Sequence, residues 1–171
     1  FNRGIIMTIH FHDSTSIASA SGLGSNAGDI LQTVGPNVLS SNFDTTSGTY
    51  QDSGIAQSIT PSATSSKIII ISCIDIQGWG DQDRRPNVGI FYGSVSNSNK
   101  LCQQVAGEYH TGGSGSYSYG GMSFWFLHSP STTSEITYRV GLASLDGSNV
   151  RIIGDTGADT RSFMYLQEVK G

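Results

Sequence analysis

The sequence twice places a Pro-Ser turn in front of a β-branched run, and this arrangement constrains the fold more than any other feature. The first copy reads ITPSATSSKIIII (59–71) and the second reads HSPSTTSEITY (128–138). Proline cannot donate a hydrogen bond to a β-ladder, so each proline closes a strand. The Ser and Thr residues that follow bond locally to the backbone and favour a turn. Each copy therefore predicts a strand, a turn and a second strand.

Four consecutive isoleucines, Ile68–Ile71, open the strand after the first turn. A strand with one face in water alternates apolar and polar residues, whereas a continuous β-branched run is typical of a strand covered on both faces. One face would lie in the core of a sandwich, and the simplest cover for the other face is a second copy of the protein. The run therefore predicts a homo-oligomer, with a trimer as the expected state.

The rest of the chain predicts an all-β protein. Gly, Ser and Thr make up more than a third of the 171 residues, strand signals recur every 8–15 residues, and no stretch shows a convincing amphipathic helix pattern. About ten strands at this spacing predict an antiparallel, jelly-roll-like β-sandwich without long helices. The formal net charge of −4 and the scattered cations argue against nucleic acid as a partner. No apolar run is long enough to predict insertion into a membrane.

The N-terminal segment predicts a separate anchoring strand. Ile6–His12 alternates, with Ile9 and Phe11 on one side and His10 and His12 on the other, and the small residues of Ser14–Gly28 form a flexible arm. We therefore expect two parts, an anchor with its arm at 1–27 and a sandwich domain at 28–171. The Ile9 and Phe11 side would pack on a partner or on sister N-termini; whether residues 1–6 are native stays open.

The two histidines of this strand are a candidate metal site. Residues i and i+2 share a face of a strand, so His10 and His12 from three chains on an axis could supply six nitrogen ligands to a transition metal. Two half-exposed strand histidines without a metal are the alternative, which we favour. No other cofactor is expected.

Two loops are candidates for surface recognition. The segment Asp81–Asn87 carries Arg84 and Arg85, and the Gly/Ser/Tyr-rich segment Tyr109–Gly121 carries Tyr109, Tyr117 and Tyr119. Loops at one end of a rigid β-scaffold commonly make the contacts with outside partners, and tyrosine gives contact area at low entropic cost. Sugar stacking and an ordinary exposed loop are the alternatives. Two tryptophans, Trp79 and Trp125, are expected in the core or an interface.

The sequence gives no pattern of an enzyme. It contains no Gly-x-Ser-x-Gly elbow, and its acidic residues near glycine are typical of turns, so we expect no catalytic residues. The two cysteines, Cys73 and Cys102, each lie in an apolar, strand-like run. Buried free thiols are favoured for them, although a disulfide stays open.

Four motifs in order resemble a domain of tailed bacteriophages, especially phages of marine hosts. The motifs are GDILQTV, SGIAQSITPSATSSKIIII, FLHSPSTTSEITYRVGL and SFMYLQEVKG, and the resemblance covers residues 28–171. It implies a non-enzymatic β-sandwich on the virion surface, as a tail-fibre or knob module or a capsid decoration protein.

The same resemblance implies assembly in the host cytoplasm, contact with other virion proteins and possible attachment to a host cell-surface glycan. The chain departs from the pattern at His128, where Asp is usual, and in the loop QGWGDQDRRPN (77–87). These departures lie in loops, so they bear on the ligand and not on the fold. A carbohydrate-binding β-sandwich outside a virion is the alternative function.

Overall fold

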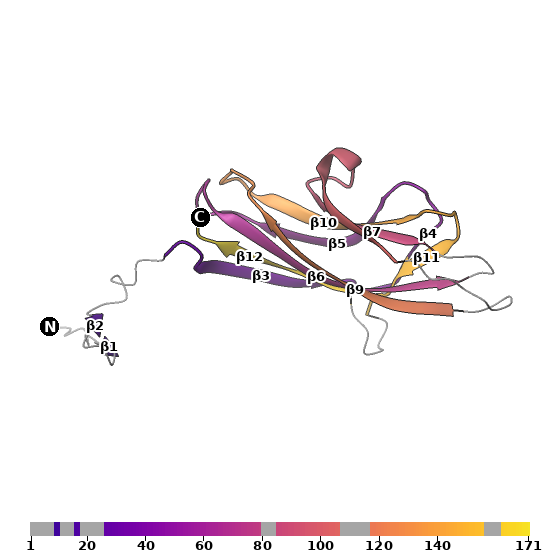
Figure 1. Ribbon diagram of the computed structural model, residues 1–171, viewed down its shortest axis with the longest axis horizontal. Helices are drawn as coiled ribbons and strands as arrows, with labels where there is room; N and C mark the ends of the chain where they lie inside the picture. The colour runs from indigo at the N-terminus through magenta and orange to yellow at the C-terminus, as the bar shows by residue number, and fades with distance from the viewer. Residues whose placement is uncertain (1–8, 11–15, 18–25, 80–84, 107–116, 156–161) are drawn as a thin grey trace.

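The computed structural model describes residues 9–10, 16–17, 26–79, 85–106, 117–155 and 162–171. Nearly every element in these ranges is a strand (Figure 1). In chain order they are β1 (Ile9–His10), β2 (Ser16–Ile17), β3 (Ile30–Val38), β4 (Phe43–Thr45), β5 (Gln51–Ile59), β6 (Lys67–Trp79), β7 (Pro86–Tyr92), the short 3-10 helix η2 (Asn97–Asn99), β8 (Lys100–Val105), β9 (Tyr117–His128), β10 (Ile136–Ser144), β11 (Asn149–Ile152) and β12 (Phe163–Val169).

Two antiparallel sheets pack face to face, which confirms the predicted β-sandwich (Figure 1). The smaller sheet has the order β5-β10-β7-β8. In the larger sheet, β12 pairs with the first half of β6 and β11 with its second half, while β9 runs along the opposite edge of β6. The outer strands β3 and β4 extend the sheet beyond β12 and β11. The strands β1 and β2 form a separate two-stranded sheet among the described residues. The anchor, its domain boundary and the trimer stay predictions.

The core lies between the two sheets and is built by alternation. Ile68, Ile70 and Ile74 of β6 are fully buried. They face a cluster from the smaller sheet that includes Ile90 of β7 and Val140 of β10. Because side chains alternate along a strand, the intervening residues of β6 point to the outer side of the larger sheet. The isoleucine run thus supplies both faces of one strand, as the sequence predicted.

Two sequence-based boundaries need correction. Thr49–Asp52 and Ala56–Thr60 were expected as separate strand segments, but one continuous strand, β5, runs from Gln51 to Ile59 because it pairs with β10 on both sides of a bulge. The expected loop Tyr109–Gly121 ends earlier, since Tyr117–Gly121 already belongs to β9. The long strand β6 explains this difference, because its last residues, up to Trp79, provide a partner for each of these positions.

The first Pro-Ser turn is held by a buried carboxylate from the last strand. Glu168 of β12 is fully buried, and its Oε1 accepts hydrogen bonds from the backbone N–H of Ser62 at 2.7 Å and from the Ser62 hydroxyl at 2.6 Å. Its Oε2 accepts a third bond from Gln32 Nε2 at 2.6 Å. Burial would raise the pKa of Glu168, but these hydrogen bonds outweigh it and hold the pKa at about 2. Two of the motifs quoted above are therefore parts of one structural contact.

The second Pro-Ser turn is closed in a different way. The backbone N–H of Ser134 donates to Thr132 Oγ1 at 3.0 Å, which makes a local turn. The strands on either side are joined by the hydroxyl of Tyr138, which is fully buried and lies 2.8 Å from Nδ1 of His128. Burial lowers the pKa of His128, so the neutral ring is favoured as the partner of that hydroxyl. The departure from the phage pattern at His128 was expected in a loop, but His128 is the last residue of β9 and its ring satisfies a buried polar group.

The smaller sheet covers its own outer face. Phe91 of β7 points to that side, yet it is fully buried, because Tyr50 packs against its ring at 4.9 Å between ring centroids. The ring lies so close to Gly141 of β10 that a Cβ there would meet Phe91 Cε2 at 2.6 Å and Val95 Cγ1 at 2.9 Å. Gly141 therefore leaves the space in which this small outer cluster forms.

Replacing Gly141 with alanine should disrupt that cluster. We expect Gly141→Ala to lower the free energy of unfolding by about 1–3 kcal/mol, because the added methyl group forces Phe91 and Val95 out of place. Urea denaturation followed by circular dichroism measures the change. Gly48→Ala is the matched control, because a Cβ there would meet only the Ser144 carbonyl oxygen, at 3.8 Å, and should leave the stability nearly unchanged. A Gly141→Ala variant as stable as the wild type would contradict this account of the cluster.

Candidate assembly surface

The outer side of the larger sheet presents a continuous apolar surface. Cross-strand pairs place Trp125 of β9 beside Ile71 of β6, and Ile71 beside Tyr165 of β12. The next pair along β9 and β6 joins Leu127 to Ile69. We call this surface the apolar face, and its residues are Ile69, Ile71, Trp125, Leu127, Phe163 and Tyr165.

The apolar face is open to water to an unusual degree. Trp125 is 73% exposed and Leu127 is 53% exposed, and Tyr119, further along β9, is 67% exposed. The Trp125 and Leu127 side chains together leave on the order of 250 Å² exposed, since a large aromatic side chain carries about 150–250 Å². That is about a third of the roughly 800 Å² that one partner contributes to a typical specific interface. On the smaller sheet, by contrast, the large outward-pointing ring of Phe91 is fully buried.

One end of the outer surface is polar. The Tyr119 hydroxyl accepts a hydrogen bond from Gln77 Nε2 at 3.1 Å. Gln77 also lies opposite Arg151 of β11, and Arg151 lies opposite Asp44 of β4. Arg151 and Asp44 form a bidentate ion pair, with Nε–Oδ1 at 2.7 Å and Nη2–Oδ2 at 3.1 Å. The apolar face is therefore bordered by satisfied polar groups, an arrangement typical of an interface centre and its rim.

The edge strand β9 adds unpaired backbone groups to this surface. Within the described part of the chain, β6 is the one strand that pairs with β9. The twelve residues of β9, YSYGGMSFWFLH, include no proline and no acidic or basic residue other than the terminal histidine. Proteins commonly protect an edge strand with lysine, proline or a bulge, because an unprotected edge pairs with other strands. The edge of β9 is thus chemically suited to accept a further strand.

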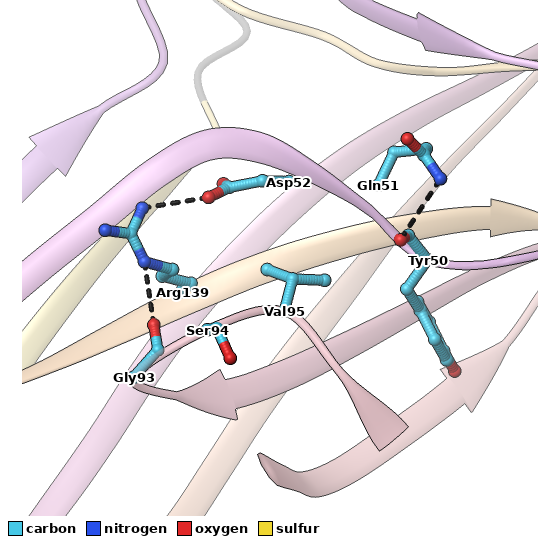
Figure 2. Close-up of a pocket in the computed structure, with 7 residues that line it drawn as sticks. All are labelled: Tyr50, Gln51, Asp52, Gly93, Ser94, Val95 and Arg139. Carbon is cyan, nitrogen blue, oxygen red and sulfur yellow. Dashed lines mark hydrogen bonds and ion pairs between the residues drawn. The ribbon is translucent and has the colours of Figure 1, made fainter. Parts of the chain in front are cut away.

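A shallow polar depression of about 500 Å³ lies on the other sheet (Figure 2). Figure 2 shows the Arg139 guanidinium between Asp52 and Gly93. Its Nη1 lies 2.8 Å from Asp52 Oδ2, and its Nε donates to the Gly93 carbonyl at 2.8 Å. The cation and the carboxylate of this depression are therefore already paired with each other.

The ring of Tyr50, which lines the depression, is in contact with other side chains of the protein. Tyr50 packs edge-on against Phe91, and Lys100 Nζ lies 5.2 Å from the centroid of the Tyr50 ring. The Tyr50 hydroxyl donates to Gln103 Oε1 at 3.0 Å, and burial raises the pKa of Tyr50 to about 12. A sugar-binding platform needs an open aromatic face, so the depression gives no specific support to a carbohydrate site.

The described part of the chain contains both cysteines and several residues of the types that bind metal ions. In the ranges given above, no three His, Cys, Asp or Glu side chains gather in a way that could hold a metal ion. Cys73 and Cys102 are both free. Cys73 lies on the outer side of β6, where its Sγ is 3.8 Å from Ser123 Oγ, whereas Cys102 packs against the core from β8.

The predicted site residues are only partly visible. Tyr119 is exposed on β9, and Arg85 is exposed just before β7. The backbones of Ile9, His10 and Tyr117 are in strands β1 and β9, but their side chains lie outside the described part, as do Phe11, His12, Arg84 and Tyr109 altogether. The anchor, the metal site and the recognition loops therefore stay predictions.

The apolar face includes residues that the sequence analysis did not identify as candidates for a contact surface. The second apolar side of Ile68–Ile71 was predicted, but Leu127 was not, and Trp125 was placed in either a core or an interface. Its exposure excludes the core. The available signal was the alternation of FWFL (124–127): Phe124 is buried, so the neighbouring Trp125 and Leu127 point outward.

Comparisons with known proteins give no family. No family model matches the chain. No curated protein matches it either.

Similar solved structures include strains and VP2 particles of infectious bursal disease virus. The Gx strain structure has a TM-score of 0.34 and 13% identity, and the match covers 96% of this chain and 42% of that one. The VP2 subviral particle has a TM-score of 0.33 and 12% identity, with 91% and 39% covered. This chain thus spans about two fifths of the length of those it matches. At this similarity the matches carry no argument about family or activity.

None of the described helical segments is long and apolar enough to cross a membrane.

Proposed function

We propose that the chain is a non-enzymatic structural protein of a tailed-phage virion, displayed on the particle surface as a fibre or knob module or as a capsid decoration protein. The observation that carries the proposal is the apolar face with Trp125 at 73% exposure beside the unprotected edge of β9. An exposed apolar patch of a few hundred Å² is comparable to the largest patch on a typical monomer, and such patches are often sites of contact with other molecules. A chain that carries such a patch beside an unprotected strand edge is suited to assembly.

The resemblance of residues 28–171 to phage surface domains supports the virion part of this proposal. The bond between Ser62 and Glu168 gives a physical reason why two of the shared motifs occur together. In this proposal the copies associate through the apolar face, with a homotrimer as the expected state, and contact other virion proteins. Host attachment would involve Arg84, Arg85, Tyr109, Tyr117 and Tyr119.

Mass spectrometry of purified particles, with heads and tails separated, tests this function. The proposal requires the chain in one of the two fractions at a stoichiometry of several copies per particle. Its absence from both fractions would contradict a virion role. Binding of the isolated chain to a glycan array, with no recovery from particles, would instead support the carbohydrate-binding alternative.

The N-terminal segment is proposed as the anchor to the particle, with Ile9 and Phe11 on the contacting side. Deletion of residues 1–26 should leave a folded sandwich, because Gly28, which the deletion keeps, donates its N–H to the carbonyl of Lys170 at 2.8 Å beside the last strand. We expect this variant to keep its circular dichroism spectrum and to be lost from particles. Normal incorporation of the deletion variant would show that the anchor lies elsewhere.

The metal site at His10 and His12 has a test of its own, which is elemental analysis of the full-length oligomer.

A further inference from the structure

The edge strand β9 carries bulky and small residues in a mirrored order about Ser123. Towards its C-terminal end it has Trp125 and Phe126, and at the matching distances on the other side it has Gly121 and Gly120. An antiparallel pair of identical strands centred on Ser123 would place Trp125 of one copy opposite Gly121 of the other. It would also place Phe126 opposite Gly120, and Leu127 opposite Tyr119.

These pairs satisfy the geometry of an antiparallel ladder. Residues directly opposite each other point to the same side of the sheet, and Ser123, Trp125 and Gly121 all lie on the outer side of β9. A two-fold axis through Ser123 maps each contact onto its equivalent, as an isologous interface requires. One strand thus supplies both the bulky groups and the spaces that receive them.

The fold of the single chain does not explain the two glycines. A Cβ at Gly120 would meet Ile76 at 3.6 Å, and a Cβ at Gly121 would meet Asp75 Oδ1 at 3.5 Å, which are ordinary contact distances. Neither residue has the positive φ that favours glycine. Gly141, by contrast, is required by the position of Phe91. The small size of Gly120 and Gly121 is therefore available for a contact made outside the chain.

We propose that β9 pairs antiparallel with β9 of a second copy about a two-fold axis at Ser123, which joins the two larger sheets into one. The occupant of this edge is a second copy because the mirrored pattern fits the strand itself. The open edge, the absence of charged residues before His128 and the exposed Trp125 all lie on this strand. The joined sheets would bury Trp125 against Gly121 of the second copy and bring the two apolar faces side by side.

This inference names the contact through which the self-association of the proposed function occurs, and it rests on that function. Its test uses the purified full-length chain and does not depend on any particle. The two-fold contact occupies the edge of β9, so the trimer contact of the proposed function would use the rest of the apolar face, on β6 and β12. Failure of the test removes the two-fold contact alone, whereas absence from particles removes the virion role alone.

Charge substitution at the axis tests the proposal most specifically. Ser123 is exposed in the single chain, so Ser123→Lys and Ser123→Asp should both fold, which circular dichroism and thermal melting check. In the pair, each substitution sets two like charges opposite each other, and we expect the Kd of the two-fold contact to rise about 100-fold. An equimolar mixture of the two variants should restore association, because opposite charges then meet at the axis.

Sedimentation velocity from micromolar concentration upwards gives the result. Loss of association in each variant, recovery in the mixture and no effect of the control Leu145→Ser would support the contact. The proposal is overturned if the wild type shows no association through this edge, if either folded variant associates as the wild type does, or if the mixture stays dissociated.

Discussion

Replacing Glu168 with glutamine should lower the free energy of unfolding at pH 7 by about 3 kcal/mol. The carboxylate is fully buried and accepts three hydrogen bonds, two of them from Ser62. Glutamine has nearly the same shape, but it has one acceptor oxygen and an NH₂ group that would face donors. Urea denaturation monitored by circular dichroism measures the loss, and Glu135→Gln, at an exposed position, is the matched control.

The same substitution should change the response to acid. The ordinary pKa of this carboxyl is 4.5, and in the folded protein it is about 2. The unfolded chain therefore takes up a proton at a higher pH than the folded protein does. The stabilising contribution of Glu168 is complete above about pH 5 and is lost as the pH falls towards 2. Between pH 7 and pH 3 the wild type should lose more stability than Glu168→Gln, and an equal loss in both would contradict the lowered pKa.

The double substitution Trp125→Ser with Leu127→Ser should weaken self-association by at least about 100-fold, because exposed aromatic anchors commonly carry most of the energy of an interface. Both side chains are mostly in water in the single chain, at 73% and 53% exposure. The free energy of unfolding of the monomer should therefore change by less than about 1 kcal/mol. Sedimentation equilibrium gives the association constant, and thermal melting in dilute solution gives the stability.

Leu145→Ser is the control for this pair. Leu145 is 42% exposed, in the turn that follows β10 and away from the apolar face. Removal of an exposed leucine there should leave the association constant unchanged. If the double variant and the control associate equally well, the apolar face is not the contact surface. If the double variant unfolds, Trp125 and Leu127 are parts of the fold rather than of an interface.

The sandwich could be predicted because local signals and tertiary packing agree. Pro61 and Pro130 end strands, and the residues after each of them form turns. The Ile68–Ile71 run predicted a strand with two apolar faces, and its alternate residues are indeed in the core and on the outer side. Sequence spacing alone could not show that β9 is an edge strand, because strand order depends on pairing between distant segments.

Polar contacts were harder to predict than strands. Glu168 reads as an ordinary surface residue in LQEVK (166–170), and its partner Ser62 is 106 residues away. Nothing in the local pattern marks it as buried. His128 was treated as a departure that bears on a ligand, whereas its ring lies 2.8 Å from the hydroxyl of Tyr138. In both cases the decisive information is a contact between segments far apart in the chain.

Hydroxyl-radical footprinting of the full-length protein, read residue by residue by mass spectrometry, tests most directly whether the apolar face is buried by assembly. The samples are the dilute chain and the assembled protein, with Leu145 as an internal reference. We predict that oxidation of Trp125 and Leu127 falls several-fold on assembly while oxidation of Leu145 stays constant. Equal oxidation of Trp125 in dilute and assembled samples would show that this face remains in water and would contradict the account.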